Sequence, residues 1–144
     1  MTDSHPDENP APDLSHVHRM WADDQASREL GMVADVIETD HAVVRMTVTE
    51  PMVNGHDIAH GGFIFTLADS TFALACNSRG ALTVASGADI TFVTSARRGE
   101  VLVADGRVRA AYGRSGITDV TVTRESDGAL VAEFRGRSRS LPRR

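Results

Sequence analysis

The stretch from Gly61 to Ser78 constrains the fold of this chain more than any other. Apolar and small residues fill nearly every position in it, and no polar stripe runs along it. A helix surrounded by other elements shows this pattern, whereas a surface helix has one polar face. Gly62 sits near its start, and Gly80 follows it as a stop signal. We therefore expect a long central helix wrapped by the rest of the chain.

Asp69 is the only acidic residue in this stretch. A carboxylate is rarely buried unless it is paired or functional, so this residue is the most informative one in the chain. Its neighbours on the same helix face, at steps of three and four, are all small: Gly62, Thr66, Ala73 and Cys76. Two interpretations stay open, because such neighbours leave room either for a ligand or for a close helix contact.

Length and composition bound the class of protein. The chain has 144 residues, enough for one domain with a core and too few for two ordinary domains. It has no apolar run of membrane-spanning length, and its acidic, proline-containing start does not resemble a signal peptide, so we expect a cytoplasmic protein. The net charge of -5 argues against generic nucleic-acid binding.

The cysteine and the arginines have plain interpretations. Cys76 is the only cysteine and falls inside the apolar stretch, so we interpret it as a core residue rather than a nucleophile. All 15 basic residues are arginine. Five crowd the C-terminus: Arg135, Arg137, Arg139, Arg143 and Arg144. They could bind a phosphorylated ligand, although a solvated strand edge is the plainer interpretation.

The order of predicted elements defines the fold class. Residues 1–13 form a predicted disordered leader, and residues 14–144 form a single domain. Ahead of the central helix we expect a helix over 14–29 and strands over 32–38 and 42–49. After it we expect strands over 82–94, 101–112, 117–125 and 129–139. The prediction is an α+β fold in which one antiparallel sheet curls around one helix.

The start of the central helix is the predicted site of chemistry. A helix N-terminus presents unpaired N–H groups and a partial positive charge, and Gly61 and Gly62 let a ligand oxygen approach them. Such a site stabilises negative charge during acyl transfer, with a carboxylate as nucleophile or as base for water. Asn54 and His60 flank this end and could hydrogen-bond substrate, or could simply form a turn and a loop contact.

Spacing adds a constraint on how this site is built. Asp69 follows Gly61 by eight residues, which separates them by about 12 Å along a helix axis. One helix therefore cannot place both groups on one small carbonyl. If both act on the same bond, the site lies between two subunits related by a two-fold axis.

Together these motifs resemble a known family. Asn54 stands seven residues before Gly61, and the segments 54–56, 60–62, 67–70, 75–78 and 85–92 keep the same order. From about Trp21 to Ser140 the chain resembles the hot-dog-fold acyl-CoA thioesterases of the phenylacetate-degradation (PaaI) type. The resemblance implies dimers that pair into tetramers. It also implies hydrolysis of aryl-acetyl-type CoA thioesters, phenylacetyl or hydroxyphenylacetyl, without metal or another cofactor.

The resemblance also implies roles for four residues. Asp69 would be the nucleophile or general base, and the backbone of Gly61 would contact the oxyanion. Asn54 and His60 would complete the catalytic site.

Further residues are implied as substrate contacts: Gly62, Thr66, Ser70, Arg98, Arg114 and Ser115. The last three would hold the CoA nucleotide. Ala73 stands where a related branch of the family has a hydroxyl residue, which leaves Thr66 or Ser70 as the nearest group that could orient water.

Two alternatives belong to other function classes. A hot-dog dehydratase acting on a hydroxyacyl thioester would need an acid/base pair, which His60 and Asp69 could form. A non-catalytic acyl-CoA-binding protein would have little need for Asp69 among apolar residues. The acyl group and the choice between nucleophile and general base stay open.

Overall fold

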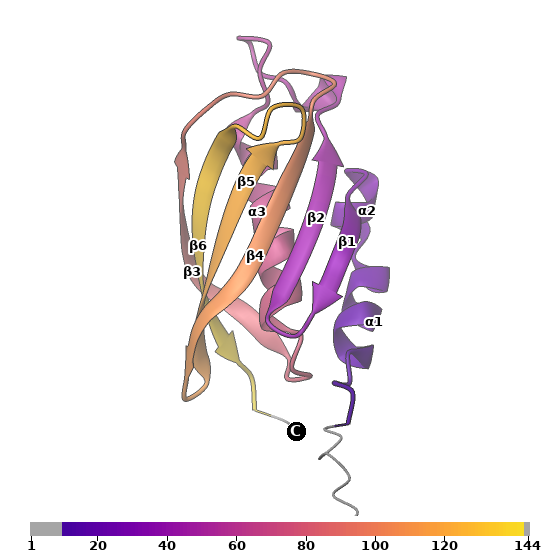
Figure 1. The fold of residues 1–144 in the computed structure, drawn as a ribbon, viewed down its shortest axis with the longest axis vertical. Helices are drawn as coiled ribbons and strands as arrows, with labels where there is room; N and C mark the ends of the chain where they lie inside the picture. Colours follow the sequence, from indigo (N-terminus) through magenta and orange to yellow (C-terminus); the bar gives the residue numbers. More distant parts are fainter. Residues whose placement is uncertain (1–9, 143–144) are drawn as a thin grey trace, which may run out of the picture.

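The computed structural model describes residues 10–142, which form one long helix packed against one six-stranded antiparallel sheet (Figure 1). Two short helices come first, α1 (Ser15–Asp23) and α2 (Gln25–Glu29), followed by the hairpin β1 (Val33–Glu38) and β2 (His41–Thr47). A 3-10 turn, η1 (Glu50–Met52), leads to the long helix α3 (Gly61–Cys76). The remaining strands are β3 (Thr83–Phe92), β4 (Val101–Tyr112), β5 (Ser115–Arg124) and β6 (Leu130–Ser140).

The predicted architecture is confirmed, and the helices differ from the prediction in two places. Residues 14–29 form two helices because Asp24 adopts an extended conformation and its side chain accepts the N–H of Ser27, capping α2. The central helix ends at Cys76 rather than Ser78, since Asn77 turns away and its side chain bonds to both backbone groups of Thr83. Residues 1–9 lie outside the described part of the chain, so the disorder predicted for the leader stays a prediction.

The sheet order is β1-β2-β4-β5-β6-β3. It curves around α3, and in Figure 1 α1 and α2 lie beside β1 at one edge while β3 forms the other edge. Since β3 pairs only with β6 among the described strands, its outer edge has backbone groups without strand partners.

The core lies between α3 and the inner face of the sheet, where Leu67, Phe72 and Leu74 are almost fully buried. Two strand glycines let the helix come close. A Cβ at Gly136 would lie 2.7 Å from the ring of Phe72, and one at Gly106 would lie 2.9 Å from Cγ2 of Thr71. Burying a side chain such as Phe72 stabilises the fold by about 2–3 kcal/mol.

No helix within residues 10–142 is long and apolar enough to cross a membrane.

Candidate active site

A cavity of about 390 Å³ lies at the N-terminal end of α3. It is lined by Asn54, Ile58, Ala59, Gly61, Ile64, Phe92, Val93, Thr94 and Ser95. The lining is mainly apolar, with a few polar groups from the loop before α3 and the segment after β3. This composition is typical of a small-molecule site.

The helix end leaves one backbone N–H without an acceptor among the described residues, at a residue that lines this cavity. His60 is the N-cap of α3, and its Nδ1 accepts the N–H of Gly62 at 3.0 Å. Its carbonyl accepts the N–H groups of Phe63 and Ile64. Among the described residues the N–H of Gly61 has no acceptor. The cap therefore uses the N–H of Gly62, and the N–H of Gly61 stays available to a ligand oxygen.

Phe92 explains why glycine is needed at position 61. A Cβ added to Gly61 would lie 2.9 Å from Cζ of the Phe92 ring, so the ring packs directly against the helix backbone. Phe92 is 51% exposed and comes from the end of β3, at the sheet edge. The ring thus forms one wall of the cavity beside the free N–H.

Asn54 also lines the cavity and carries a second donor. Its Oδ1 accepts the N–H of His56 at 2.9 Å and that of Ile58 at 3.4 Å, which fixes the orientation of the amide. The Nδ2 group has no acceptor within residues 10–142 and belongs to a half-buried side chain that lines the cavity. The turn interpretation of Asn54 is confirmed, and its contact with substrate stays a prediction.

Asp69 lies half-buried farther along α3 and does not line this cavity. Its carboxylate has no hydrogen bond or ion pair to the described side chains. Desolvation by burial, and secondarily the negative charge of Asp24, raises the pKa of Asp69 above its usual value. A carboxylate without partners and with a raised pKa is suited to accept a proton.

Two hydroxyl residues predicted as substrate contacts are engaged elsewhere. Thr66 Oγ1 donates to the carbonyl of Gly62 at 2.8 Å. Ser70 is buried, and its Oγ lies 2.8 Å from Oγ of Ser27 on α2. The docking of α2 makes this hydroxyl a contact between helices, and the substrate contact expected of Ser70 stays a prediction. The hydroxyl of Thr66 faces its own helix backbone, although its side chain is half-exposed.

The residues predicted for the CoA nucleotide are not brought together in one chain. Arg98 precedes β4 and lies 3.6 Å from Glu50, whereas Arg114 and Ser115 follow β4 at the opposite end of the sheet. At about 3.3 Å per residue, the length of β4 separates the two places by roughly 40 Å. Within one chain, Arg98 and Arg114 cannot contact the same nucleotide.

Cys76 fits the core interpretation. Desolvation by burial raises the pKa of its thiol to about 12, so it stays protonated at neutral pH and is a poor nucleophile. Among the described residues, no group of three or more His, Cys, Asp and Glu side chains is placed to hold a metal ion.

Sequence reasoning missed the far wall of the cavity. Phe92 and Ser95 lie more than thirty residues after Asn54 and reach the cavity because β3 and the following segment run past the start of α3. The sequence held a weak signal, because Phe92 ends a strand and the hydroxyl residues Thr94 and Ser95 come shortly after it. That pattern has no spacing relation to α3, so it could not be assigned to the site.

Comparisons with known proteins agree with this geometry. Residues 56–131 match the family model described as the thioesterase superfamily. The chain therefore belongs to the thioesterase superfamily, and it is a thioester hydrolase with the hot-dog fold.

Comparisons with individual proteins show which members of the superfamily this chain resembles. The chain is 40% identical over 128 residues to the acyl-coenzyme A thioesterase PaaI of Escherichia coli, covering 88% of this chain and 89% of that protein. The structure of that PaaI protein, from the phenylacetic acid degradation operon, superimposes with a TM-score of 0.86 at 38% identity, over 89% of this chain and 92% of the other. Human acyl-coenzyme A thioesterase 13 is 34% identical over 75% of this chain and 79% of its own length.

A further structure contains a bound thioester. The protein smu.793 of Streptococcus mutans, in a structure bound to acetyl-CoA, has a TM-score of 0.74 at 29% identity and covers 78% of this chain and 90% of its own.

Proposed function

We propose that the chain is an acyl-CoA thioesterase that hydrolyses aryl-acetyl-type thioesters, such as phenylacetyl-CoA or hydroxyphenylacetyl-CoA, to free acid and CoA. One observation carries the proposal: Gly61 and Asn54 line one largely apolar cavity, and neither the N–H of Gly61 nor Nδ2 of Asn54 has an acceptor among the described residues. The E. coli relative from the phenylacetic acid degradation operon supports the aryl-acetyl class. The acetyl-CoA held by the S. mutans protein supports a CoA thioester.

In the proposed mechanism the thioester carbonyl oxygen accepts the N–H of Gly61. The negative charge that develops on this oxygen is stabilised by that donor, by the positive end of α3 and by the Asn54 amide. Water adds to the carbonyl carbon as the Asp69 carboxylate takes its proton, and the C–S bond then breaks to release CoA thiolate. The same carboxylate could attack directly to give an anhydride, which water would then cleave.

The active Asp69 comes from a second copy of the chain. Eight residues of α3 separate it from Gly61, about 12 Å along the axis, so one chain cannot place both on one carbonyl. The outer edge of β3 supports a dimer, since an unpaired edge with exposed apolar side chains such as Val84 and Val93 is suited to pairing with another copy. A tetramer of two such dimers and a cytoplasmic location stay predictions.

The structure argues against the dehydratase alternative. That reaction would use His60 as one member of the acid/base pair, but Nδ1 of His60 already accepts the N–H of Gly62. The neutral ring therefore carries its proton on Nε2 and has no free lone pair.

The first test measures release of free thiol from phenylacetyl-CoA, hydroxyphenylacetyl-CoA and a panel of straight-chain acyl-CoAs by the wild-type protein. We expect the highest kcat/KM for the two aryl-acetyl thioesters. A higher kcat/KM for straight chains would refute the aryl-acetyl assignment. No thiol release from any thioester would refute hydrolysis, and formation of an enoyl thioester from a hydroxyacyl-CoA would establish the dehydratase.

Hybrid dimers test the shared site. A chain with Asn54→Asp and a chain with Asp69→Asn are each expected to be nearly inactive. In a hybrid of the two, one of the two sites combines an intact Asn54 with an intact Asp69. If equal amounts exchange subunits freely, about a quarter of the wild-type activity returns. No recovery in dimers shown by mass spectrometry to be mixed would place the whole site within one chain.

A further inference from the structure

The N-terminal helices dock on α3 through a short chain of polar groups beside Asp69. Oδ1 of Asp24 accepts the N–H of Ser27 at 2.9 Å, and Oδ2 accepts its hydroxyl at 2.7 Å. The Ser27 hydroxyl lies 2.8 Å from that of Ser70. Both serines are buried, at 1% and 9% exposure. Because buried hydrogen-bonded groups have little freedom, this chain holds the Asp24 carboxylate in a fixed place next to the residue that follows Asp69.

Holding the polar groups of Asp24, Ser27 and Ser70 in fixed places costs free energy, which indicates a role beyond the docking of α2. α2 has only five residues, and Asp24, its N-cap, is half-buried rather than fully solvated. It also brings the charge of Asp24 to act on the Asp69 carboxylate, which has no partner in the part of the chain that the structure describes. Like charges repel, so a fold selected only for docking would be served as well by an uncharged Asn, which caps helices about equally.

We propose that Asp24 is a positioning residue for thioester hydrolysis: through Ser27 and Ser70, α2 holds the Asp24 carboxylate against the turn of α3 that carries Asp69. This inference rests on the proposed function for its catalytic meaning. Its electrostatic content concerns the two carboxylates alone and can be measured without any turnover.

Within residues 10–142 of one chain, Asp24 is the charged group that acts on the pKa of Asp69. α3 carries no other ionised side chain, and its thiol, Cys76, stays protonated at neutral pH. The strands present uncharged residues to α3, because their charged side chains lie on the outer face of the sheet. Other titratable groups on the packed helices are engaged elsewhere: His16 bonds to Asn77, and Arg28 donates to the carbonyl of Ala22.

The sign of the effect follows from electrostatics. A nearby negative charge favours the protonated form of a carboxyl, and Asp24 acts in this direction on the pKa of Asp69, in addition to burial. A higher pKa makes the carboxylate a stronger base, provided it is still ionised at the working pH. The N-terminal helices would thus strengthen the base, and the acid limb of the pH profile would move to higher pH.

The test uses Asp24→Asn, which removes the charge and keeps an N-cap side chain. The pKa of Asp69 is followed by the 13C shift of its carboxyl, assigned by its absence in Asp69→Asn. The pH dependence of kcat/KM is followed in parallel. We expect both the titration and the acid limb to move to lower pH. The matched control is Asp23→Asn, which removes an exposed charge one residue earlier and should move neither.

Ser27→Ala provides a second, independent arm. It removes the hydroxyl that links Asp24 to Ser70, so the Asp69 titration should move in the same direction by a smaller amount. A contrary outcome is that both variants lower the melting temperature and yet leave the Asp69 titration at its wild-type position. In that case the Asp24–Ser27–Ser70 hydrogen bonds are only a docking contact, and the inference is wrong. If the wild type releases no thiol, the proposed function fails, yet the titration still decides the inference.

Discussion

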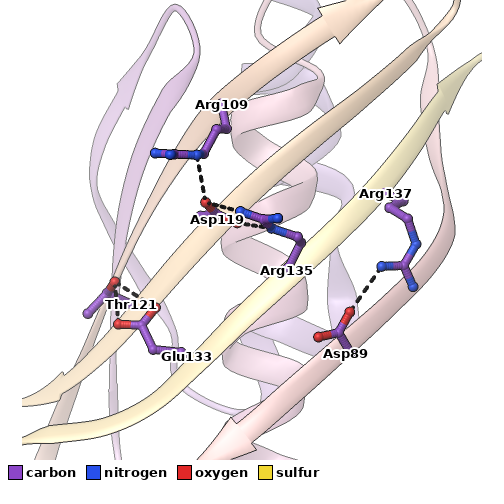
Figure 2. A network of polar contacts seen from close by, with 7 residues as sticks. All are labelled: Asp89, Arg109, Asp119, Thr121, Glu133, Arg135 and Arg137. Atoms are coloured by element: carbon purple, nitrogen blue, oxygen red, sulfur yellow. Dashed lines mark hydrogen bonds and ion pairs between the residues drawn. The ribbon is translucent and has the colours of Figure 1, made fainter.

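The outer face of the sheet and the N-terminal end of α3 both carry polar groups, but they differ in whether those groups have partners. On the outer face Arg135 donates to Asp119 at 2.7 and 3.0 Å, and Arg137 donates to Asp89 at 3.0 Å (Figure 2). Thr121 and Glu133 form a further pair there. At the end of α3, residues that line a cavity carry donors with no acceptor among the described residues.

This comparison shows why size and charge alone do not identify a site. A larger hollow of about 790 Å³ lies on the outer face, lined by paired residues such as Asp105, Arg109 and Asp119. Its charges already satisfy one another in solvent, where such pairs contribute little. The same pairing favours the strand-surface interpretation of Arg135 and Arg137 over a phosphate site. Arg143 and Arg144 lie outside the described residues.

The largest effect is expected from Asp69→Asn. Loss of the base should lower kcat/KM roughly 10²- to 10⁴-fold in thiol-release assays. The free energy of unfolding, by contrast, should increase at neutral pH. The folded-state pKa of Asp69 is raised, so ionisation opposes folding above the unfolded-state pKa, and the cost is complete above the folded one.

The melting temperature of Asp69→Asn should therefore exceed that of the wild type at neutral pH. The two should converge as the pH falls below the unfolded-state pKa, where Asp69 is protonated in both states. A variant that loses both activity and stability would show that Asp69 is a structural residue.

Asn54→Asp comes next. The side chain keeps the oxygen that accepts the N–H of His56, but it replaces the free Nδ2 donor with a negative charge beside the developing oxyanion. We expect kcat to fall roughly 10²- to 10³-fold. Ser126→Asp adds a charge at an exposed turn and serves as the control, which should retain wild-type kcat. Retained kcat in Asn54→Asp would show that the unpaired donor at the end of α3 is no more important for the reaction than the paired groups on the outer face.

Gly61→Ala should have a smaller effect. Its Cβ would meet the tip of the Phe92 ring at 2.9 Å, and the ring must shift because it is the mobile partner. The expected loss is roughly tenfold in kcat/KM, with little change in melting temperature. Gly55→Ala is the matched control, since a Cβ there meets nothing within 4 Å. Equal losses of kcat/KM in the two variants would contradict the role given to Phe92 as a wall of the cavity.

The smallest effect is expected on the outer face, from Asp119→Asn. The hydrogen bond from Arg135 and, secondarily, the arginine charges hold the pKa of Asp119 below its usual value, so its stabilising contribution is present above the unfolded-state pKa and is lost as pH falls through the folded one. Thermal unfolding should show a slight destabilisation at neutral pH that vanishes in acid, with kcat/KM unchanged. A fall in activity would mean that the outer face takes part in the reaction.

The sequence determined what depends on neighbouring residues. Alternation predicted β4 over 101–112, as observed, because every second side chain of a strand faces the core. The unbroken apolar stretch predicted α3, and the short spacing from Asn54 to Gly61 placed both at one cavity. Asp24 was missed as a helix break, since a polar residue in a helical run is indistinguishable from the exposed face of that helix.

Only the tertiary structure decided which polar groups lack a hydrogen-bond partner among the described residues. Ser70 and Asp69 are adjacent in the chain, yet α2 docks on Ser70, while the Asp69 carboxylate has no partner within residues 10–142. Phe92 reaches Gly61 because β3 runs along the sheet edge past the start of α3. Periodicity acts through a few neighbouring residues, whereas these contacts join segments tens of residues apart, and their geometry follows from how the sheet curves around the helix.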